Sequence, residues 1–131
     1  MIQTIIILSM LFLHIVDDYY LQGILASMKQ RSWWKKNAPD DLYKHDYIVA
    51  LLEHAFSWTF MIMLPILMAW WVGIIQVTIA DFTLMFVTNL VIHAYIDNEK
   101  ANRKTINLIV DQSAHIFQII CTAIHFLFIM E

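Results

Sequence analysis

The sequence contains few of the glycines and prolines that favour turns and few of the charged residues that cover solvent-exposed surfaces. Its 131 residues include 2 Gly, 2 Pro and 1 Cys, and only 15% of them are charged. One cysteine excludes a disulfide framework, and Cys121, set in an apolar stretch, is expected to be a small buried side chain. By contrast, 60% of the residues are hydrophobic, a balance that soluble domains of this size rarely show. The composition therefore favours a membrane protein.

Four apolar segments are long enough to cross a bilayer as helices. They cover residues 2–27, 47–71, 74–97 and 105–130, each near or above the roughly 20 residues that a spanning helix needs. Pro65 is expected to kink the second segment. The sequence thus predicts an all-α, polytopic membrane protein with a single domain over residues 1–131, built as a bundle of four transmembrane helices.

The basic residues predict how this bundle is oriented. All eight Lys and Arg side chains fall in two connections, residues 29–46 and 98–104. Because loops rich in Lys and Arg stay in the cytoplasm, both connections are expected there, with both termini outside. Trp33 and Trp34, beside two lysines, suit a segment that lies on anionic lipid head groups, and a solvated basic loop is the alternative. The expected partners are the lipid bilayer and that anionic lipid at residues 29–46. No nucleic acid is expected, and a homo-oligomer is left open.

Three of the four segments carry a polar triplet at four-residue spacing, which places each triplet on one helix face. The triplets are His14-Asp18-Gln22, Asn89-His93-Asp97 and Asn107-Asp111-His115. The remaining segment carries His54, ten residues after Lys44. Given the predicted orientation, every helix has a histidine at a similar depth in the cytoplasmic half, so these side chains are expected to converge. Such groups are costly within a membrane and usually functional.

The converging side chains predict a metal site. Its candidate ligands are His14, Asp18, His54, His93, Asp97, Asp111 and His115. Imidazole combined with carboxylate suits a divalent ion, Zn first, with Mn or Fe as alternatives. The nearby amides would orient the ligands or join helices by hydrogen bonds; they are Gln22, Asn89, Asn107 and Gln112. Interhelical hydrogen bonding without any metal is the competing interpretation.

Other polar residues are weaker candidates. Asp17, Glu53 and Tyr19 flank the cluster in sequence. Asp81 and His125 lie in the outer halves of their helices, where structural roles are expected. A continuous polar stripe from the cluster to those two residues would favour transport instead.

The order of these motifs resembles the signature of a small bacterial and phage integral-membrane family of unknown function. That signature reads His-x-x-x-Asp-x-x-Leu-Gln, a lone His, His-x-x-x-Asp and Asp-Gln-x-x-His. The chain matches it at residues 14–22, at His54, at residues 93–97 and at residues 111–115. The resemblance implies the bacterial inner membrane and supplies no known activity. The chain is more distantly similar to inner-membrane metal-dependent hydrolases, a likeness that implies a metal and hydrolysis by analogy.

The leading hypothesis is a metal-dependent hydrolase that acts on a lipid-linked or membrane-proximal substrate. A bound ion would activate a water molecule, Asp18 or Asp97 would be the general base, and His115 would protonate the leaving group. One alternative is an ion transporter or proton-coupled channel, because buried His–Asp chains also relay protons. Another is a non-catalytic membrane interaction protein, such as a phage accessory factor. A site confined to one leaflet favours the enzyme.

Overall fold

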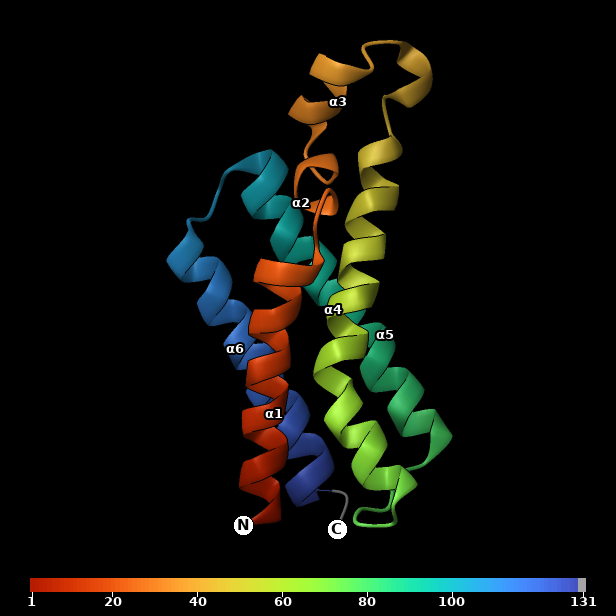
Figure 1. Cartoon of the computed structure of the whole chain (residues 1–131), viewed down its shortest axis with the longest axis vertical. Helices are drawn as coiled ribbons and strands as arrows, with labels where there is room; N and C mark the ends of the chain where they lie inside the picture. Colours follow the sequence, from red (N-terminus) through yellow and green to blue (C-terminus); the bar gives the residue numbers. More distant parts are fainter. Residues whose placement is uncertain (130–131) are drawn as a thin grey trace.

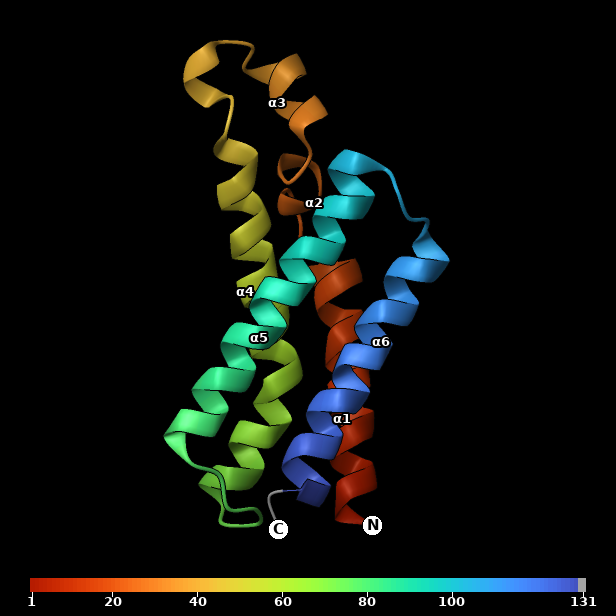
Figure 2. The same cartoon turned by 180° about the vertical axis from the view of Figure 1, so that it is seen from behind.

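Four long helices dominate the fold. The computed structural model describes residues 1–129, which form helices joined by turns. The long helices are α1 (Ile2–Val16), α4 (Asp46–Trp71), α5 (Ile79–Asn98) and α6 (Leu108–Ile124). Figure 1 and Figure 2 show them running along the long axis of the molecule. An all-α chain with four long helices is thereby confirmed for the part that the structure describes.

Three helical stretches within the described residues are long and apolar enough to cross a membrane. They are Ile2–Leu21, Asp41–Trp71 and Ile79–Arg103. By length and composition, these stretches suggest a membrane protein. α6 is not among the three, and the predicted end of the fourth segment at Met130 lies outside the described residues.

Turns of π-helix continue three of the long helices. η1 (Asp17–Leu21) follows α1, η3 (Glu99–Arg103) follows α5, and η4 (His125–Ile129) follows α6. A π-helical turn holds more residues than an α-helical turn, so it changes which side chains face the bundle. In η1, both Asp17 and Asp18 are buried, although neighbours in a regular α-helix diverge by about 100°.

Side-chain caps start two helices later than the sequence predicts. Thr78 Oγ1 accepts a hydrogen bond from the backbone N–H of Asp81 at 3.1 Å, and α5 begins at Ile79 rather than at residue 74. Asn107 Oδ1 accepts one from the backbone N–H of Val110 at 3.0 Å, so α6 begins only after it. Asn107 is therefore a helix cap and not part of the buried polar face.

A short helical hairpin separates α1 from α4. The first helical stretch ends at Leu21 rather than at residue 27, because Gly23 adopts a left-handed backbone with φ 49°. α2 (Leu25–Met28), α3 (Arg31–Asn37) and the 3-10 turn η2 (Asp41–Tyr43) follow and lie at the top of Figure 1. Residues 29–46 are thus largely folded rather than an open loop.

Aromatic side chains hold this hairpin together and join it to α4. Trp34 Nε1 donates to the carbonyl of Met28 at 2.7 Å, and its ring stacks on Tyr43 with an interplanar angle of 19°. The guanidinium of Arg31 donates to the hydroxyl of Tyr47 at 2.5 Å and lies 4.6 Å from the centre of that ring. Two residues of the predicted lipid-binding segment therefore have partners within the protein.

The two ends of the molecule differ in what they contain. The hairpin and residues 99–107 lie at one end, called here the hairpin end (Figure 1). Both termini and the turn between α4 and α5 lie at the other, the termini end (Figure 2). Both basic connections therefore lie at the same end, which the predicted orientation requires.

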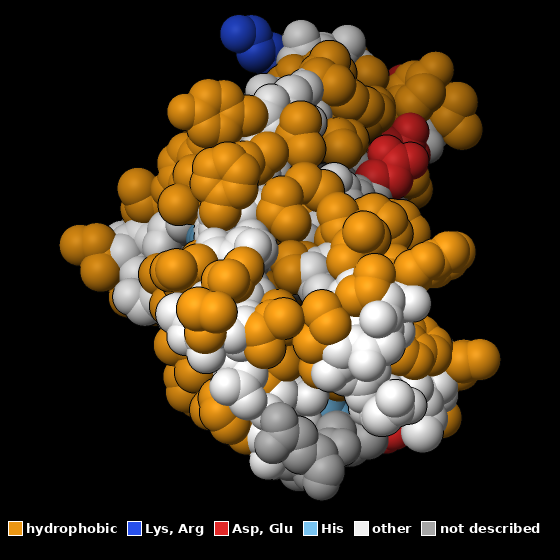
Figure 3. Space-filling model, turned by 60° about the horizontal axis from the view of Figure 1, so that its bottom comes forward, with side chains coloured by type: hydrophobic (Ala, Val, Ile, Leu, Met, Phe, Trp, Pro, Cys, Tyr) orange, Lys and Arg blue, Asp and Glu red, His pale blue; other side chains and the backbone are white. Residues whose placement is uncertain are grey.

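Apolar side chains fill the termini half of the bundle and also cover its outside. The buried core there includes Ile6, Met10, Ile62, Met63, Ile66, Ile119 and Phe126. Large exposed side chains, such as Leu8, Phe60, Leu84 and Phe117, occur on every long helix. Figure 3 shows hydrophobic side chains over most of the face seen from the termini end.

Cys121 belongs to this apolar exterior. Its side chain is exposed, so the prediction of a buried cysteine was wrong. The prediction failed because apolar neighbours indicate burial only where the surface is polar, and this bundle is apolar outside as well as inside.

Candidate functional site

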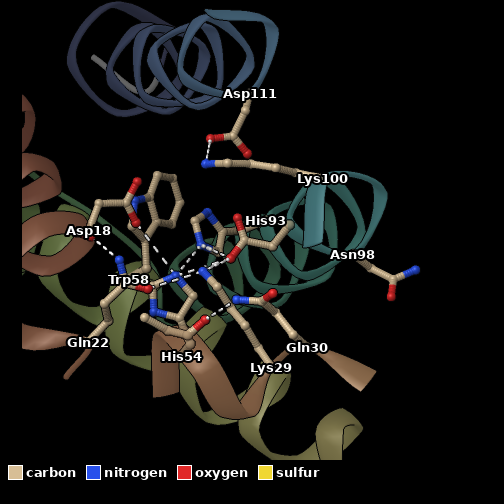
Figure 4. Close-up of polar contacts among 12 residues, drawn as sticks. Asp18, Gln22, Lys29, Gln30, His54, Trp58, His93, Asn98, Lys100 and Asp111 are labelled. Atoms are coloured by element: carbon tan, nitrogen blue, oxygen red, sulfur yellow. Dashed lines mark hydrogen bonds and ion pairs between the residues drawn. The ribbon is translucent and has the colours of Figure 1, made fainter. Parts of the chain in front are cut away.

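All seven predicted ligands are buried, and all four helical stretches contribute to them. His14 lies on α1, Asp18 on η1, His54 on α4, His93 and Asp97 on α5, and Asp111 and His115 on α6. Figure 4 shows Asp18, His54 and His93 directed into the same space. The structure thus brings together, in the hairpin half of the bundle, residues as far apart in sequence as His14 and His115.

Three imidazoles form a row at the centre. His93 Nε2 lies 3.2 Å from His54 Nε2, and His93 Nδ1 lies 3.2 Å from His115 Nδ1. Because a hydrogen bond needs one proton between two nitrogens, these contacts restrict the tautomers of all three rings. The indole of Trp58 stacks on His93, with ring centres 4.1 Å apart and an interplanar angle of 16°. This stacking fixes the orientation of the His93 ring.

Asp97 lies near all three histidines of the row and also binds the hairpin. Its Oδ2 lies 3.2 Å from His54 Nε2, and its Oδ1 lies 3.4 Å from His115 Nε2. Lys29 Nζ donates to the same Oδ2 at 2.6 Å. Lys29, expected in a basic connection, is thus directed inward and supplies a positive charge beside the histidines.

His54 has a carboxylate near each of its ring nitrogens. Asp18 Oδ1 lies 3.5 Å from His54 Nε2, while Asp18 Oδ2 accepts a hydrogen bond from Gln112 Nε2 at 3.1 Å. On the other side, Asp17 Oδ2 lies 3.8 Å from His54 Nδ1, and Asp17 Oδ1 accepts from Ser57 Oγ at 2.6 Å. Asp17 is therefore an inner member of the cluster and not a peripheral one.

Two overlapping sets of three side chains are placed so that each could hold a metal ion. One set is Asp18, His54 and His93, and the other is His93, Asp97 and His115; within each, the offered atoms all lie within 4.8 Å of one another. Each set supplies two imidazoles and one carboxylate. That donor set is found in catalytic zinc sites and in non-haem iron sites, where non-protein ligands complete the coordination. The donors themselves do not select one ion among Zn, Mn and Fe.

His14 lies outside both sets because both of its ring nitrogens are engaged. Trp58 Nε1 donates to His14 Nδ1 at 2.8 Å, so this nitrogen carries no proton. The proton therefore lies on Nε2, which donates to Gln112 Oε1 at 3.1 Å. A chain of hydrogen bonds thus runs from Trp58 through His14 and Gln112 to Asp18.

Asp111 also lies outside both sets, and a lysine holds it. Lys100 Nζ donates to Asp111 Oδ2 at 2.7 Å, and Gln112 Nε2 donates to the same oxygen at 3.0 Å. The other oxygen, Oδ1, lies 3.5 Å from His115 Nε2. Asp111 therefore contacts the row from the side of α6.

The remaining predicted amides have structural contacts. Gln118 Nε2 donates to Asn89 Oδ1 at 2.8 Å, and Asn89 Nδ2 donates to Thr122 Oγ1 at 2.9 Å, which joins α5 to α6. This layer lies on the termini side of the histidines, and the apolar core follows it. Gln22 donates to the backbone carbonyl of Asp18 and accepts from Lys29 at 3.1 Å.

Trp58 and Lys29 were not foreseen as members of the cluster. Trp58 carries a usable signal, because it follows His54 by four residues and so shares its helix face. Lys29 carries none, since its inward direction depends on how the hairpin packs beside α4. The flanking candidates Glu53 and Tyr19 are exposed.

Fold and site together define a class: an all-α chain with candidate membrane-spanning helices and a buried His/Asp cluster that could hold a metal ion. The family model DUF3307, described as a protein of unknown function, matches residues 6–130. The match covers most of the sequence, and the chain belongs to the DUF3307 family. No curated protein and no solved structure matches the chain. Resemblance to a family of unknown function is thus confirmed, and the match brings no activity with it.

Proposed function

We propose that this chain is a four-span membrane protein that hydrolyses a lipid-linked or membrane-proximal substrate with the help of a divalent ion. The charge of the cluster is the observation that carries the proposal. Its buried carboxylates are Asp17, Asp18, Asp97 and Asp111. Within the part of the chain that the structure describes, only two ammonium groups, those of Lys29 and Lys100, pair with them. With neutral histidines, two negative charges stay unbalanced, and unpaired buried charge is costly. A divalent cation would balance both.

The set of Asp18, His54 and His93 suits that ion best. Asp17 stands behind His54, in the carboxylate–histidine arrangement that orients metal-binding imidazoles. Asp17 Oδ2 and His54 Nδ1 have no hydrogen-bond partner among the described residues, so a small closure of their 3.8 Å contact would pair them. Three protein ligands would leave a coordination position open for water, as catalytic zinc sites do.

Two neighbours of this set would handle protons. The ion, when bound, would supply an activated water molecule. Asp97, whose Oδ2 lies 3.2 Å from His54 Nε2, would accept a proton from that water as the general base. His115 would donate a proton to the leaving group, since its Nε2 lies 3.4 Å from Asp97 Oδ1 and has no hydrogen-bond partner among the described residues.

The membrane placement is part of the proposal. α6 and η4 together run from Leu108 to Ile129, and roughly 20 residues suffice to span a bilayer core. We place the hairpin end in the bacterial cytoplasm and both termini outside, following the positions of the basic residues. The exposed lysines Lys35 and Lys36 of α3 would then contact anionic lipid head groups. A homo-oligomer stays a prediction.

The row of three imidazoles supports a second candidate, a proton-coupled channel or transporter. Nitrogen pairs 3.2 Å apart would let a proton pass from ring to ring. Protons on two imidazoles would also balance the charge of the carboxylates. The apolar core beyond Asn89 closes the row toward the termini end, which favours a one-sided site over a path through the membrane.

Metal content and turnover of the full chain, purified in detergent without chelator, test the hydrolase. We expect about one divalent ion per chain, and loss of that ion in His54→Ala. Asp97→Asn should keep the ion and lose turnover, because an amide cannot take a proton from water. Asp81→Asn, at the capped start of the same helix, is the matched control and should keep both.

Turnover would be measured with reconstituted protein and Zn, Mn or Fe on a panel of ester-linked and phosphorylated lipids. Wild-type protein without a bound ion would contradict the proposal, and so would an Asp97→Asn variant as active as Asp81→Asn. Proton flux into vesicles that depends on His93, without any turnover, would favour the channel.

A further inference from the structure

A pocket connects the cluster to the outside at the hairpin end. Its volume is about 490 Å³, and it lies between the hairpin on one side and η3 with the following loop on the other. Its lining includes Gln22, Lys29, Asp97, Lys100, Lys104 and Ile106. Asp97 belongs to both the pocket and the cluster, so a molecule in this pocket would lie against the carboxylate that contacts the histidine row.

The pocket gathers positive charge. Three of the eight basic residues of the chain line it, and they stand on opposite walls. Lys29 comes from the hairpin, and Figure 4 shows Lys29 and Lys100 reaching toward the cluster from different elements. Lys104 ends η3 with a left-handed backbone of φ 57°, and it is exposed at the rim. The lining contains three lysines and one carboxylate, a balance that attracts an anion.

Two of these lysines are shared between the pocket and the carboxylates behind it. Lys29 binds Asp97 and Lys100 binds Asp111. A divalent ion in the set of Asp18, His54 and His93 would offset two negative charges and weaken the hold of the carboxylates on both lysines. The ammonium groups would then be available to an anion that enters the pocket.

We propose that this pocket binds a phosphate group of the substrate, an inference that rests on the proposed hydrolase function and names its substrate class. Lysine is a recurrent phosphate partner because its ammonium acts as a compact point charge. A phosphate dianion would place its charge between the two lysine walls and beside Asp97 and the ion. Ala26, Ala101 and Ile106 form an apolar part of the same lining, against which the rest of the molecule would lie.

Metal binding and phosphate binding should help each other. The ion lowers the negative charge of the cluster, and the phosphate in turn favours lysines that have left their carboxylates. Because coupling between two sites is reciprocal, zinc should raise phosphate affinity by the same factor as phosphate raises zinc affinity. Surface lysines remote from the cluster would show no such coupling.

Titration of the detergent-purified full chain with two probes tests the inference, once with zinc and once after chelation. One probe is inorganic phosphate, and the other is short-chain phosphatidic acid in mixed micelles. Lys104→Gln removes an ammonium that does not pair with the cluster, and phosphate affinity should fall about tenfold. Lys44→Gln, which removes an exposed lysine outside both this pocket and α3, is the matched control and should leave the affinity unchanged.

Each outcome separates the possibilities. Binding of both probes, or of either alone, with loss in Lys104→Gln only, supports the pocket and shows whether the phosphate comes from solution or from a lipid head group. Zinc-loaded protein that binds neither probe, or that loses equal affinity in both lysine variants, overturns the phosphate pocket and leaves the hydrolase proposal intact. Phosphate binding in protein that takes up none of Zn, Mn and Fe overturns the hydrolase proposal instead.

Discussion

The hairpin half and the termini half of the bundle fill the space between the same four helical stretches with different side chains. At the termini end, the filling is apolar, with Ile62, Ile66 and Phe126 fully enclosed. At the hairpin end, histidines, aspartates and a lysine occupy the equivalent space. The layer that joins Asn89 to Gln118 and Thr122 divides the two halves.

This difference separates packing from function. In a membrane, where lipid is as apolar as an isoleucine side chain, the termini half would gain little from the hydrophobic effect and would depend on close packing instead. The hairpin half carries several ionisable groups that a purely structural bundle would avoid, since each is expensive within a membrane. In the proposed function, a divalent ion balances the charge of the polar half, and the apolar half packs the helices that carry the ligands.

The largest effect should follow from removing the residue common to both candidate ligand sets. His93→Ala deletes a donor from each set and the centre of the imidazole row. Zinc affinity should fall by more than about 100-fold, beyond the loss expected for outer contacts of a metal site. Competition with a chromophoric chelator measures it.

His45→Ala is the control, because His45 is exposed at the start of α4. Equal zinc affinities in the two alanine variants would show that the ion is held elsewhere. The contrast between the two halves would then have no connection with metal.

A substitution in the termini half should lower the stability of the protein and leave its zinc affinity unchanged. Ile62→Ala removes a fully buried side chain of the apolar core and should lower the free energy of unfolding by about 2 kcal/mol. Zinc affinity should stay at the wild-type value, because Ile62 belongs to the core cluster and not to the histidine row. Unfolding in mixed detergent micelles gives the stability, and the same chelator competition gives the affinity.

Ile120→Ala makes the same chemical change at an exposed position of α6 and should be nearly neutral. A loss of zinc in Ile62→Ala that matches the loss in His93→Ala would mean that the two halves are not separable.

The helical framework and most of the cluster follow from the sequence alone. Apolar length fixes where helices form, and four-residue spacing turns Asp18, His93 and His115 to the inside of their helices. Both rules act within one helix, so they hold before any tertiary contact is known. DUF3307 membership agrees with the same motifs.

What the sequence does not predict depends on local exceptions and on tertiary structure. The caps at Thr78 and Asn107 set where α5 and α6 begin, although the apolar sequence starts earlier. The π-helical turn η1 changes the register that would have turned Asp17 away from Asp18. Lys29 enters the cluster because Gly23 breaks the helix and the hairpin that follows packs beside α4. None of these is a periodic signal.

The smallest effect should arise at the boundary between the two halves, where Trp58 belongs to both. Its ring is part of the apolar core, and its Nε1 donates to His14 Nδ1 at 2.8 Å. Trp58→Phe keeps an aromatic ring but leaves that nitrogen of His14 without its donor, so the hydrogen-bond chain through Gln112 no longer orients Asp18. Zinc affinity should fall about tenfold, the size of effect that outer contacts of metal sites have.

Trp71→Phe, at an 83% exposed position at the end of α4, should leave zinc affinity unchanged. If Trp58→Phe bound zinc as tightly as Trp71→Phe, His14 would serve the packing of the bundle and not the geometry of the ligands.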